Sequence, residues 1–188
     1  MSRNLAIVDI QTLFLAAREE YGPLARVDYV KLKTVFKEDD TDIVDPVAYI
    51  LASPYHDDRR FLRFLKKHGY ILMRKFAQLD ISGAQASHTE SKLRNKSWID
   101  SMVWESIKMV PKYDKIYIVS GNGQFCSVVE AAKRNGKKAI VASFRSSLQD
   151  QLSKLADQVI YLDQEYIFDS SAFASKREQE NEGQTKTP

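Results

Sequence analysis

Four polar residues occupy places where an α/β protein could build a catalytic site. Asp9 follows a short apolar run near the start of the chain, Asn122 and Gln124 follow a later one, and Asp100 lies in the helical pattern before it. Because the carboxyl ends of parallel strands gather at one edge of a sheet, we expect these side chains to meet there. Two carboxylates among oxygen ligands would hold a hard cation such as Mg²⁺, with several waters in its shell.

Each of the two acids also has an ordinary structural explanation. Asp9 ends a strand that leads into a helix, so its carboxylate is suited to accept backbone N–H groups as a helix N-cap. Asp100 is expected in the first turn of its helix, where a negative charge favours the helix dipole. The sequence leaves the structural and the catalytic interpretation open for both residues.

The turn Ser120-Gly121-Asn122-Gly123 follows an apolar strand and precedes a helical pattern. Backbone N–H groups at such a helix start can cradle a phosphate. However, the dinucleotide-binding fingerprint needs a third glycine where this chain has Cys126, and the phosphate-binding loop needs a Gly-Lys-Ser/Thr ending that is absent here. The alternative interpretation is a tight strand-to-helix turn.

One window of the chain is strongly basic, although the formal net charge is only +3. Basic side chains on a helix and on the following strand would track an RNA backbone, and Tyr55, Trp98 or Trp104 would offer a face for base stacking. The alternative is a solvated basic face whose apolar side packs on the sheet. The residues in this acid-free window are Arg59, Arg60, Arg63, Lys66, Lys67, Arg74 and Lys75.

Apolar runs and helical patterns alternate along the chain, and this alternation predicts the fold. A strand followed by a helix implies a crossover to a parallel strand, and repetition places helices on both faces of one sheet. We therefore expect a three-layer α/β/α fold with a central, mostly parallel sheet. Residues 78–95 lack periodicity and are expected to form a long loop. Strands are predicted at 5–8, 47–52, 70–76, 115–119, 138–144 and 159–162, and helices at 13–20, 27–36, 56–68, 97–110, 125–134 and 147–157.

Length and composition favour one intracellular domain. We expect this domain to span residues 1–168, followed by a polar, disordered tail at 169–188. The single cysteine, Cys126, and the lack of a leader pattern predict a cytoplasmic protein, and no apolar stretch reaches the roughly 20 residues that cross a membrane. The three histidines are too scattered for a zinc site, and Cys126 is expected in the core.

Three short motifs occur in an order that is typical of one family. Residues 9–14 (Asp-Ile-Gln-Thr-Leu-Phe) resemble an opening Asp-Gly-x-Asn-Leu motif. Residues 96–100 (Lys-Ser-Trp-Ile-Asp) resemble a Lys-Gly-x-Asp helix start with one residue more. Residues 119–125 (Val-Ser-Gly-Asn-Gly-Gln-Phe) resemble a Val-Ser-Gly-Asp-Gly-Asp-Phe signature. The helix and turn from Arg59 to Tyr70 and a Ser-x-x-Leu pattern near Ser147 also match. Over about residues 3–165, the chain resembles the NYN (LabA-like) domains of the PIN-like ribonuclease superfamily.

The resemblance implies a catalytic site with a reduced acid cluster. Ribonucleases of this type use several acids to hold Mg²⁺ or Mn²⁺, which activates water and stabilises the charge on the phosphate. Asp9 and Asp100 are retained as the implied metal ligands, whereas Asn122 and Gln124 replace two aspartates. Two negative charges are lost, so we expect weak cation binding. The implied catalytic residues are Asp9, Asp100, Asn122 and Gln124, and Lys96 and Ser120 join the basic residues expected to contact RNA.

Three functions are compatible with these observations. The first is an RNA-binding PIN-like domain in which catalysis is weakened or lost, with Mg²⁺ or Mn²⁺ bound weakly and no other cofactor. The second is an active Mg²⁺- or Mn²⁺-dependent endoribonuclease that uses Asp9 and Asp100. The third is a scaffold that contacts a protein partner or a second copy of itself. Charge reversal of Arg59, Arg60 and Arg63 would leave the activity of such a scaffold unchanged.

Overall fold

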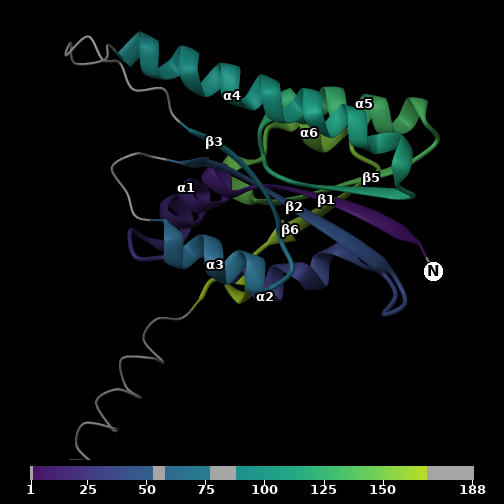
Figure 1. Cartoon of the computed structure of the whole chain (residues 1–188). Coiled ribbons are helices and arrows are strands. Elements are labelled where there is room, and N and C mark those ends of the chain that lie inside the picture. The colour runs from purple at the N-terminus through teal and green to yellow at the C-terminus, as the bar shows by residue number, and fades with distance from the viewer. Residues whose placement is uncertain (1, 53–57, 77–87, 169–188) are drawn as a thin grey trace, which may run out of the picture.

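The fold is built on a six-stranded parallel sheet with the strand order β3-β2-β1-β4-β5-β6 (Figure 1). The computed structural model describes residues 2–52, 58–76 and 88–168, with the backbone alone for residues 52, 76 and 88–97. Every pair of neighbouring strands in this sheet is parallel. The strands are β1 (Arg3–Asp9), β2 (Ile43–Ala52), β3 (Ile71–Phe76), β4 (Lys115–Val119), β5 (Lys138–Phe144) and β6 (Gln158–Leu162).

Helices cover both faces of the sheet and enclose two cores (Figure 1). One face carries α1 (Ile10–Tyr21), α2 (Tyr29–Leu32) and α3 (Arg59–Lys67), and the other carries α4 (His88–Met109), α5 (Cys126–Arg134) and α6 (Asp150–Leu155). The predicted three-layer α/β/α fold is confirmed. None of the described helices has the length and apolar content needed to cross a membrane. Short 3₁₀ turns are η1 (Lys33–Phe36), η2 (Val110–Lys112), η3 (Gly123–Phe125), η4 (Arg145–Ser147) and η5 (Gln164–Tyr166).

The central strands are apolar along most of their length because both faces of the sheet are covered. In β1, Ala6 and Val8 belong to the core under α1–α3, whereas Leu5 and Ile7 belong to the core under α4–α6. Side chains alternate between the faces of a strand. The same alternation places Asp9, the last residue of β1, on the α4–α6 face.

The order in which strands are added to the sheet reverses between β1 and β4. β2 and β3 lie on one side of β1, and β4, β5 and β6 lie on the other. Ligands of open α/β sheets bind outside the carboxyl ends of the strands at such a switch point. Asp9 ends β1, and Ser120 directly follows β4, whose Val119 pairs with Val8. Both residues therefore lie at the switch point on the edge where the strands end, here called the carboxyl edge.

α4 begins earlier than predicted, and this changes the place of Asp100. The helix starts at His88 and not at residue 97, so the loop predicted at 78–95 is wrong from His88 onward, while the rest of that loop lies outside the described ranges. The first residues of α4 include good helix formers but no apolar stripe, which is why periodicity missed them. Asp100 lies in the interior of α4, so its interpretation as a first-turn residue is wrong.

Other elements differ from the prediction mainly at their ends. The helix predicted at 27–36 is divided into α2 and η1, and the one predicted at 147–157 is shortened to α6. The helix predicted at 56–68 is described as α3, which begins at Arg59. Gly69 follows it with a φ of 81°, the left-handed conformation that terminates many helices.

Tyr117 of β4 has a buried hydroxyl with no hydrogen-bond partner among the described residues. An unsatisfied buried hydroxyl is destabilising, so we expect Tyr117→Phe to raise the free energy of unfolding by about 1–3 kcal/mol or to leave it unchanged. Urea denaturation measures this quantity. In the matched variant Tyr70→Phe, we expect a loss of about 1 kcal/mol, because the Tyr70 hydroxyl donates to the carbonyl of Tyr29 at 2.7 Å. An equal loss in both variants would contradict the assignment.

Candidate functional site at the carboxyl edge

Asp9 is buried at the end of β1, and hydrogen bonds engage both of its carboxylate oxygens. Oδ1 accepts the backbone N–H of Thr12 at 3.1 Å, and Oδ2 accepts the hydroxyls of Thr12 at 2.5 Å and of Ser120 at 3.0 Å. Asp9 is therefore the N-cap of α1, as its structural interpretation predicted. The bond from Ser120 also joins β1 to the end of β4 across the switch point.

Burial changes the acidity of Asp9. The residue is 2% exposed, and this desolvation raises the pKa of its carboxyl above the ordinary value, although the hydrogen bonds from Thr12 and Ser120 act in the opposite direction. Asp9 therefore binds a proton more readily than an ordinary aspartate. Hydrogen bonds from Thr12 and Ser120 already engage both oxygens, so a metal ion bound to Asp9 would have to share or displace them.

A continuous hydrogen-bonded path runs from Asp9 to Asp100 through the turn after β4. The Ser120 hydroxyl accepts the N–H of Asn122 at 3.2 Å, and the Asn122 side-chain oxygen accepts the N–H of Gln124 at 2.9 Å. The Gln124 side-chain amide then donates to Oδ1 of Asp100 at 3.2 Å. The four residues expected at the catalytic site thus lie together at the carboxyl edge, and their catalytic role stays a prediction.

Because Asn122 and Gln124 are amides, hydrogen bonds can join Asp9 to Asp100 without a cation between them. Gln124 donates an N–H to Asp100, whereas an ionised acid at position 124 would repel that carboxylate. Asn122 caps η3 with its oxygen, a contact that an aspartate would also make. Within the part of the chain that the structure describes, no group of three or more His, Cys, Asp or Glu residues could hold a metal ion.

Close packing explains the glycines of the turn. A Cβ on Gly121 would lie 2.1 Å from the backbone oxygen of Ser147, so the two backbones touch there. Gln149 completes the contact, because its N–H donates to the Gly121 carbonyl at 3.0 Å and its side-chain oxygen accepts the N–H of Gly123 at 3.1 Å. The turn is thus held from one side by residues 145–149.

Two residues of the site were missed by the sequence analysis. Thr12 lies in the motif at residues 9–14 but was given no role, although its position three residues after an N-cap is a signal for a contact with Asp9. Gln149 lies in the closing segment near Ser147, and no local pattern indicates that it reaches the distant turn at Gly121.

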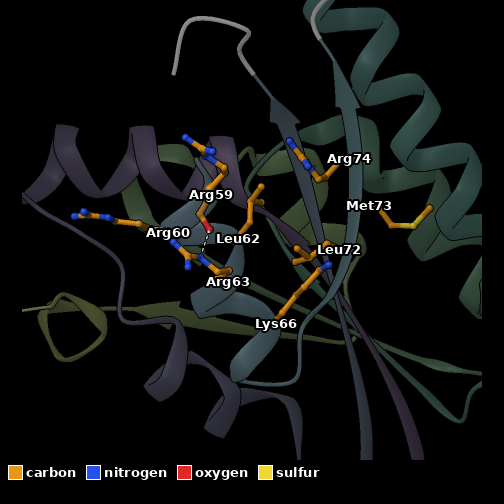
Figure 2. Close-up of a pocket in the computed structure, with 8 residues that line it drawn as sticks. All are labelled: Arg59, Arg60, Leu62, Arg63, Lys66, Leu72, Met73 and Arg74. Carbon is orange, nitrogen blue, oxygen red and sulfur yellow. Dashed lines mark hydrogen bonds between the residues drawn. The ribbon is translucent and has the colours of Figure 1, made fainter. Parts of the chain in front are cut away.

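A basic groove lies between α3 and β3 (Figure 2). Its volume is about 1080 Å³, and cationic side chains surround an apolar floor. Five of the residues predicted to contact RNA line this one hollow. The feature is here called the arginine groove, and its lining residues are Arg59, Arg60, Arg63 and Lys66 of α3, Arg74 of β3, and the apolar Leu62, Leu72 and Met73.

Several charges of the arginine groove are not neutralised within the described protein. Arg60, Arg63 and Lys66 are exposed, and the described residues place no carboxylate within salt-bridge distance of them. Arg63 donates through Nε to the backbone carbonyl of Arg59 at 3.4 Å, which holds the Arg63 side chain along α3 (Figure 2). Arg60, Arg63 and Lys66 therefore bring positive charge to the groove that no described carboxylate neutralises.

The other basic or polar residues predicted to contact RNA lie elsewhere. Lys67 is exposed on α3 but does not line the arginine groove. Ser120 is completely buried, and its hydroxyl donates to Asp9. In the structure Ser120 therefore positions the turn. Lys96 lies outside the described side chains.

The aromatic residues predicted to stack on RNA bases differ in their exposure. Trp98 is buried, with its ring 6.1 Å from that of Tyr49, so its prediction as an open stacking face is wrong. Its apolar surface belongs to the α4 core. Trp104, about 1.7 turns further along α4, is 62% exposed. Tyr55 lies outside the described residues.

The comparison with protein families decides the classification. The family model described as NYN domain matches residues 4–163 of the chain. The chain belongs to the NYN-domain family. The NYN domain has a fold of the PIN-like nuclease superfamily, in agreement with the motifs at Asp9, Asp100 and Ser120.

This NYN domain also resembles a solved structure, that of a protein of unknown function from Vibrio parahaemolyticus. The two share a TM-score of 0.71 and 24% sequence identity, over 89% of this chain and 96% of the other. At this identity the likeness shows the fold alone. The comparison with curated proteins gave no match.

The donor set of this NYN domain fits a divalent cation poorly. Asp9 has both oxygens engaged by hydrogen bonds, and Asp100 shares one oxygen with Gln124. A hard cation prefers several charged oxygens, and two of the four positions here carry neutral amides.

We expect Gly121→Ala to destabilise the fold strongly, because its Cβ would meet backbone atoms of Ser147 that cannot move alone. The expected loss in the free energy of unfolding is about 2–4 kcal/mol, measured by urea denaturation. The control is Gly123→Ala, whose Cβ would meet the flexible end of Gln149 at 2.4 Å. There we expect a loss of about 1 kcal/mol. Similar small losses in both variants would argue against the backbone contact.

Proposed function

We propose that this NYN domain binds RNA along the carboxyl edge of its sheet and that its ribonuclease chemistry is weakened or lost. The observation that carries the proposal is the arginine groove, where five cationic side chains surround an apolar floor. Neutralisation of phosphates by such side chains releases counterions from the RNA and needs no metal ion. The apolar floor suits the sugar or base of a bound nucleotide.

The arginine groove lies close to the site of Asp9. Arg74 pairs with Ile50, which is one residue beyond Tyr49, the register partner of Asp9. The backbones at Arg74 and Asp9 are thus two strands apart at nearly the same level of the sheet, which corresponds to about 10 Å. Arg74 faces α3 and Asp9 faces the α4–α6 side, so the carboxyl edge separates the two side chains. An RNA strand in the groove would extend to the four site residues within a few nucleotides.

Weak catalysis is supported by the charge of the site. Asp9 and Asp100 are the two acids of the hydrogen-bonded path, and Asn122 and Gln124 keep its geometry without adding charge. We propose that Mg²⁺ or Mn²⁺ binds there weakly through Asp9 and Asp100. RNA binding would then be insensitive to chelation.

We expect the double variant Arg60→Gln/Arg63→Gln to bind single-stranded RNA more weakly than the wild type in EDTA. If each arginine contacts one phosphate, the slope of log affinity against log salt should fall by about 1.4, or about 0.7 per lost contact. Fluorescence anisotropy with labelled RNA at several salt concentrations measures this slope. The control is Lys112→Gln/Arg134→Gln, which removes two exposed cations at the opposite edge of the sheet and should leave the slope unchanged.

Parallel measurement of cleavage separates the alternatives. An active endoribonuclease would cleave the RNA in Mn²⁺, and EDTA or Asp9→Asn would abolish cleavage. A protein scaffold would retain no RNA in either condition, and the arginine variant would behave as the wild type. Retention in EDTA that the arginine variant weakens, with little or no cleavage in Mn²⁺, supports the proposal. Equal retention by the wild type and the arginine variant would overturn it.

A further inference from the structure

A row of residues at one level of the sheet connects Asp9 with the edge strand β6. The register aligns Val8, Val119, Ala142 and Ile160 across β1, β4, β5 and β6. The next residue along each strand is therefore level with Asp9. These residues are Ser120, Ser143 and Tyr161, and side-chain alternation places them on the same α4–α6 face as Asp9.

Tyr161 ends this row with an exposed aromatic ring. The residue is 44% exposed, and the guanidinium carbon of Arg145 lies 4.0 Å from the centroid of its ring. The described residues provide no salt bridge to Arg145, which is itself exposed. A planar cation stacked on an aromatic ring is a surface on which an unpaired base can stack.

The Tyr161–Arg145 pair is tied to the candidate site through η4. Arg145 begins η4, and Ser147, which ends it, packs against Gly121. The hydroxyls of Ser143 and Ser147 are 3.0 Å apart, so this segment is also fixed to β5. The pair therefore has a defined position relative to the turn that holds Asn122 and Gln124.

We infer that Tyr161 and Arg145 form a base-stacking platform for single-stranded RNA. This inference rests on the proposed function and adds a second contact region, on the far side of the site from the arginine groove. The groove supplies positive charge for phosphates, and the platform supplies a flat surface for a base. One strand of RNA would then pass from the arginine groove, over the switch point, to the edge strand β6.

The dimensions of the sheet set the length of RNA that this path needs. Tyr161 is three strands from Asp9, or about 14 Å, and Arg74 is two strands away in the other direction, or about 10 Å. The two regions are therefore about 24 Å apart along the sheet, which corresponds to at least about seven nucleotides at a stacked spacing of about 3.4 Å, because the strand must also cross the carboxyl edge from one face of the sheet to the other. A tetranucleotide is too short to occupy both, whereas a 12-nucleotide RNA is long enough.

The test compares binding of these two RNAs to the full chain in EDTA by fluorescence anisotropy, with the tetranucleotide measured as a competitor. We expect Tyr161→Ala to weaken binding of the 12-nucleotide RNA at least about fivefold, the effect of losing one stacked base. Its effect on the tetranucleotide held in the arginine groove should be negligible. Tyr161→Phe keeps the ring and should bind both RNAs as the wild type does.

Trp104 provides a control, because it is the more exposed aromatic residue at 62% and lies on α4 with Lys108 Nζ 5.8 Å from its ring. A loss of affinity in Trp104→Ala, with none in Tyr161→Ala, would overturn the inference. The inference would also be overturned if Tyr161→Ala lowered the free energy of unfolding or dissociated a dimer without weakening binding of the 12-nucleotide RNA.

The arginine variant distinguishes failure of this inference from failure of the proposed function. If Arg60→Gln/Arg63→Gln weakens both RNAs and Tyr161→Ala weakens neither, the inference alone is wrong. If the arginine variant binds both RNAs as the wild type does, the proposed function is wrong as well.

Discussion

The buried carboxylate of Asp9 is the constraint on which the rest of the site depends. A polar group that is 2% exposed needs partners inside the protein, because an unsatisfied one costs about 2–7 kcal/mol. Thr12 and Ser120 provide these partners, and in doing so they fix the start of α1 to the end of β4. The turn after Ser120 can then take one conformation, which the contact of Gly121 with Ser147 enforces from the other side.

The site thereby keeps its shape with groups of its own chain. In an acid cluster the carboxylates repel one another, and a cation between them restores the balance. Here Gln124 donates to Asp100 and Asn122 caps the turn, so the same positions are joined by hydrogen bonds. In the function that we propose, RNA is therefore bound mainly by the positively charged surfaces beside the carboxyl edge and not by a metal ion at its centre.

Much of the fold could be predicted because strands buried on both faces leave continuous apolar runs. The bounds of β4 and β5 match the runs at 115–119 and 138–144, and Asp9 could be placed because a strand that ends in an acid before a helix offers an N-cap. The start of α4 could not be predicted, because its first residues are mostly polar and show no periodic spacing of apolar residues. Trp98 was misjudged because an aromatic residue in a basic region suits a core and a stacking surface equally well.

Contacts between distant segments set the limit of prediction for the site. The pairing of Gln149 with Gly121 and Gly123 depends on how η4 docks against the turn, and nothing in either segment specifies the other. The arginine groove combines Arg74 with the arginines of α3. Its composition was visible in the sequence, but the hollow itself requires the packing of α3 on β3.

The most direct test of this account is the effect of Mn²⁺ on the melting temperature of the wild type and of Asn122→Asp/Gln124→Asp, measured by calorimetry with EDTA as the reference. Selective binding to the folded state raises stability by mass action, and for a domain of this size about 1 kcal/mol corresponds to roughly 2–4 °C. We expect almost no shift for the wild type. The double variant should melt at a lower temperature than the wild type in EDTA, and Mn²⁺ should raise its melting temperature, since two added carboxylates need a cation. A shift of the wild type as large as that of the double variant would contradict the claim that this site is complete without a metal ion.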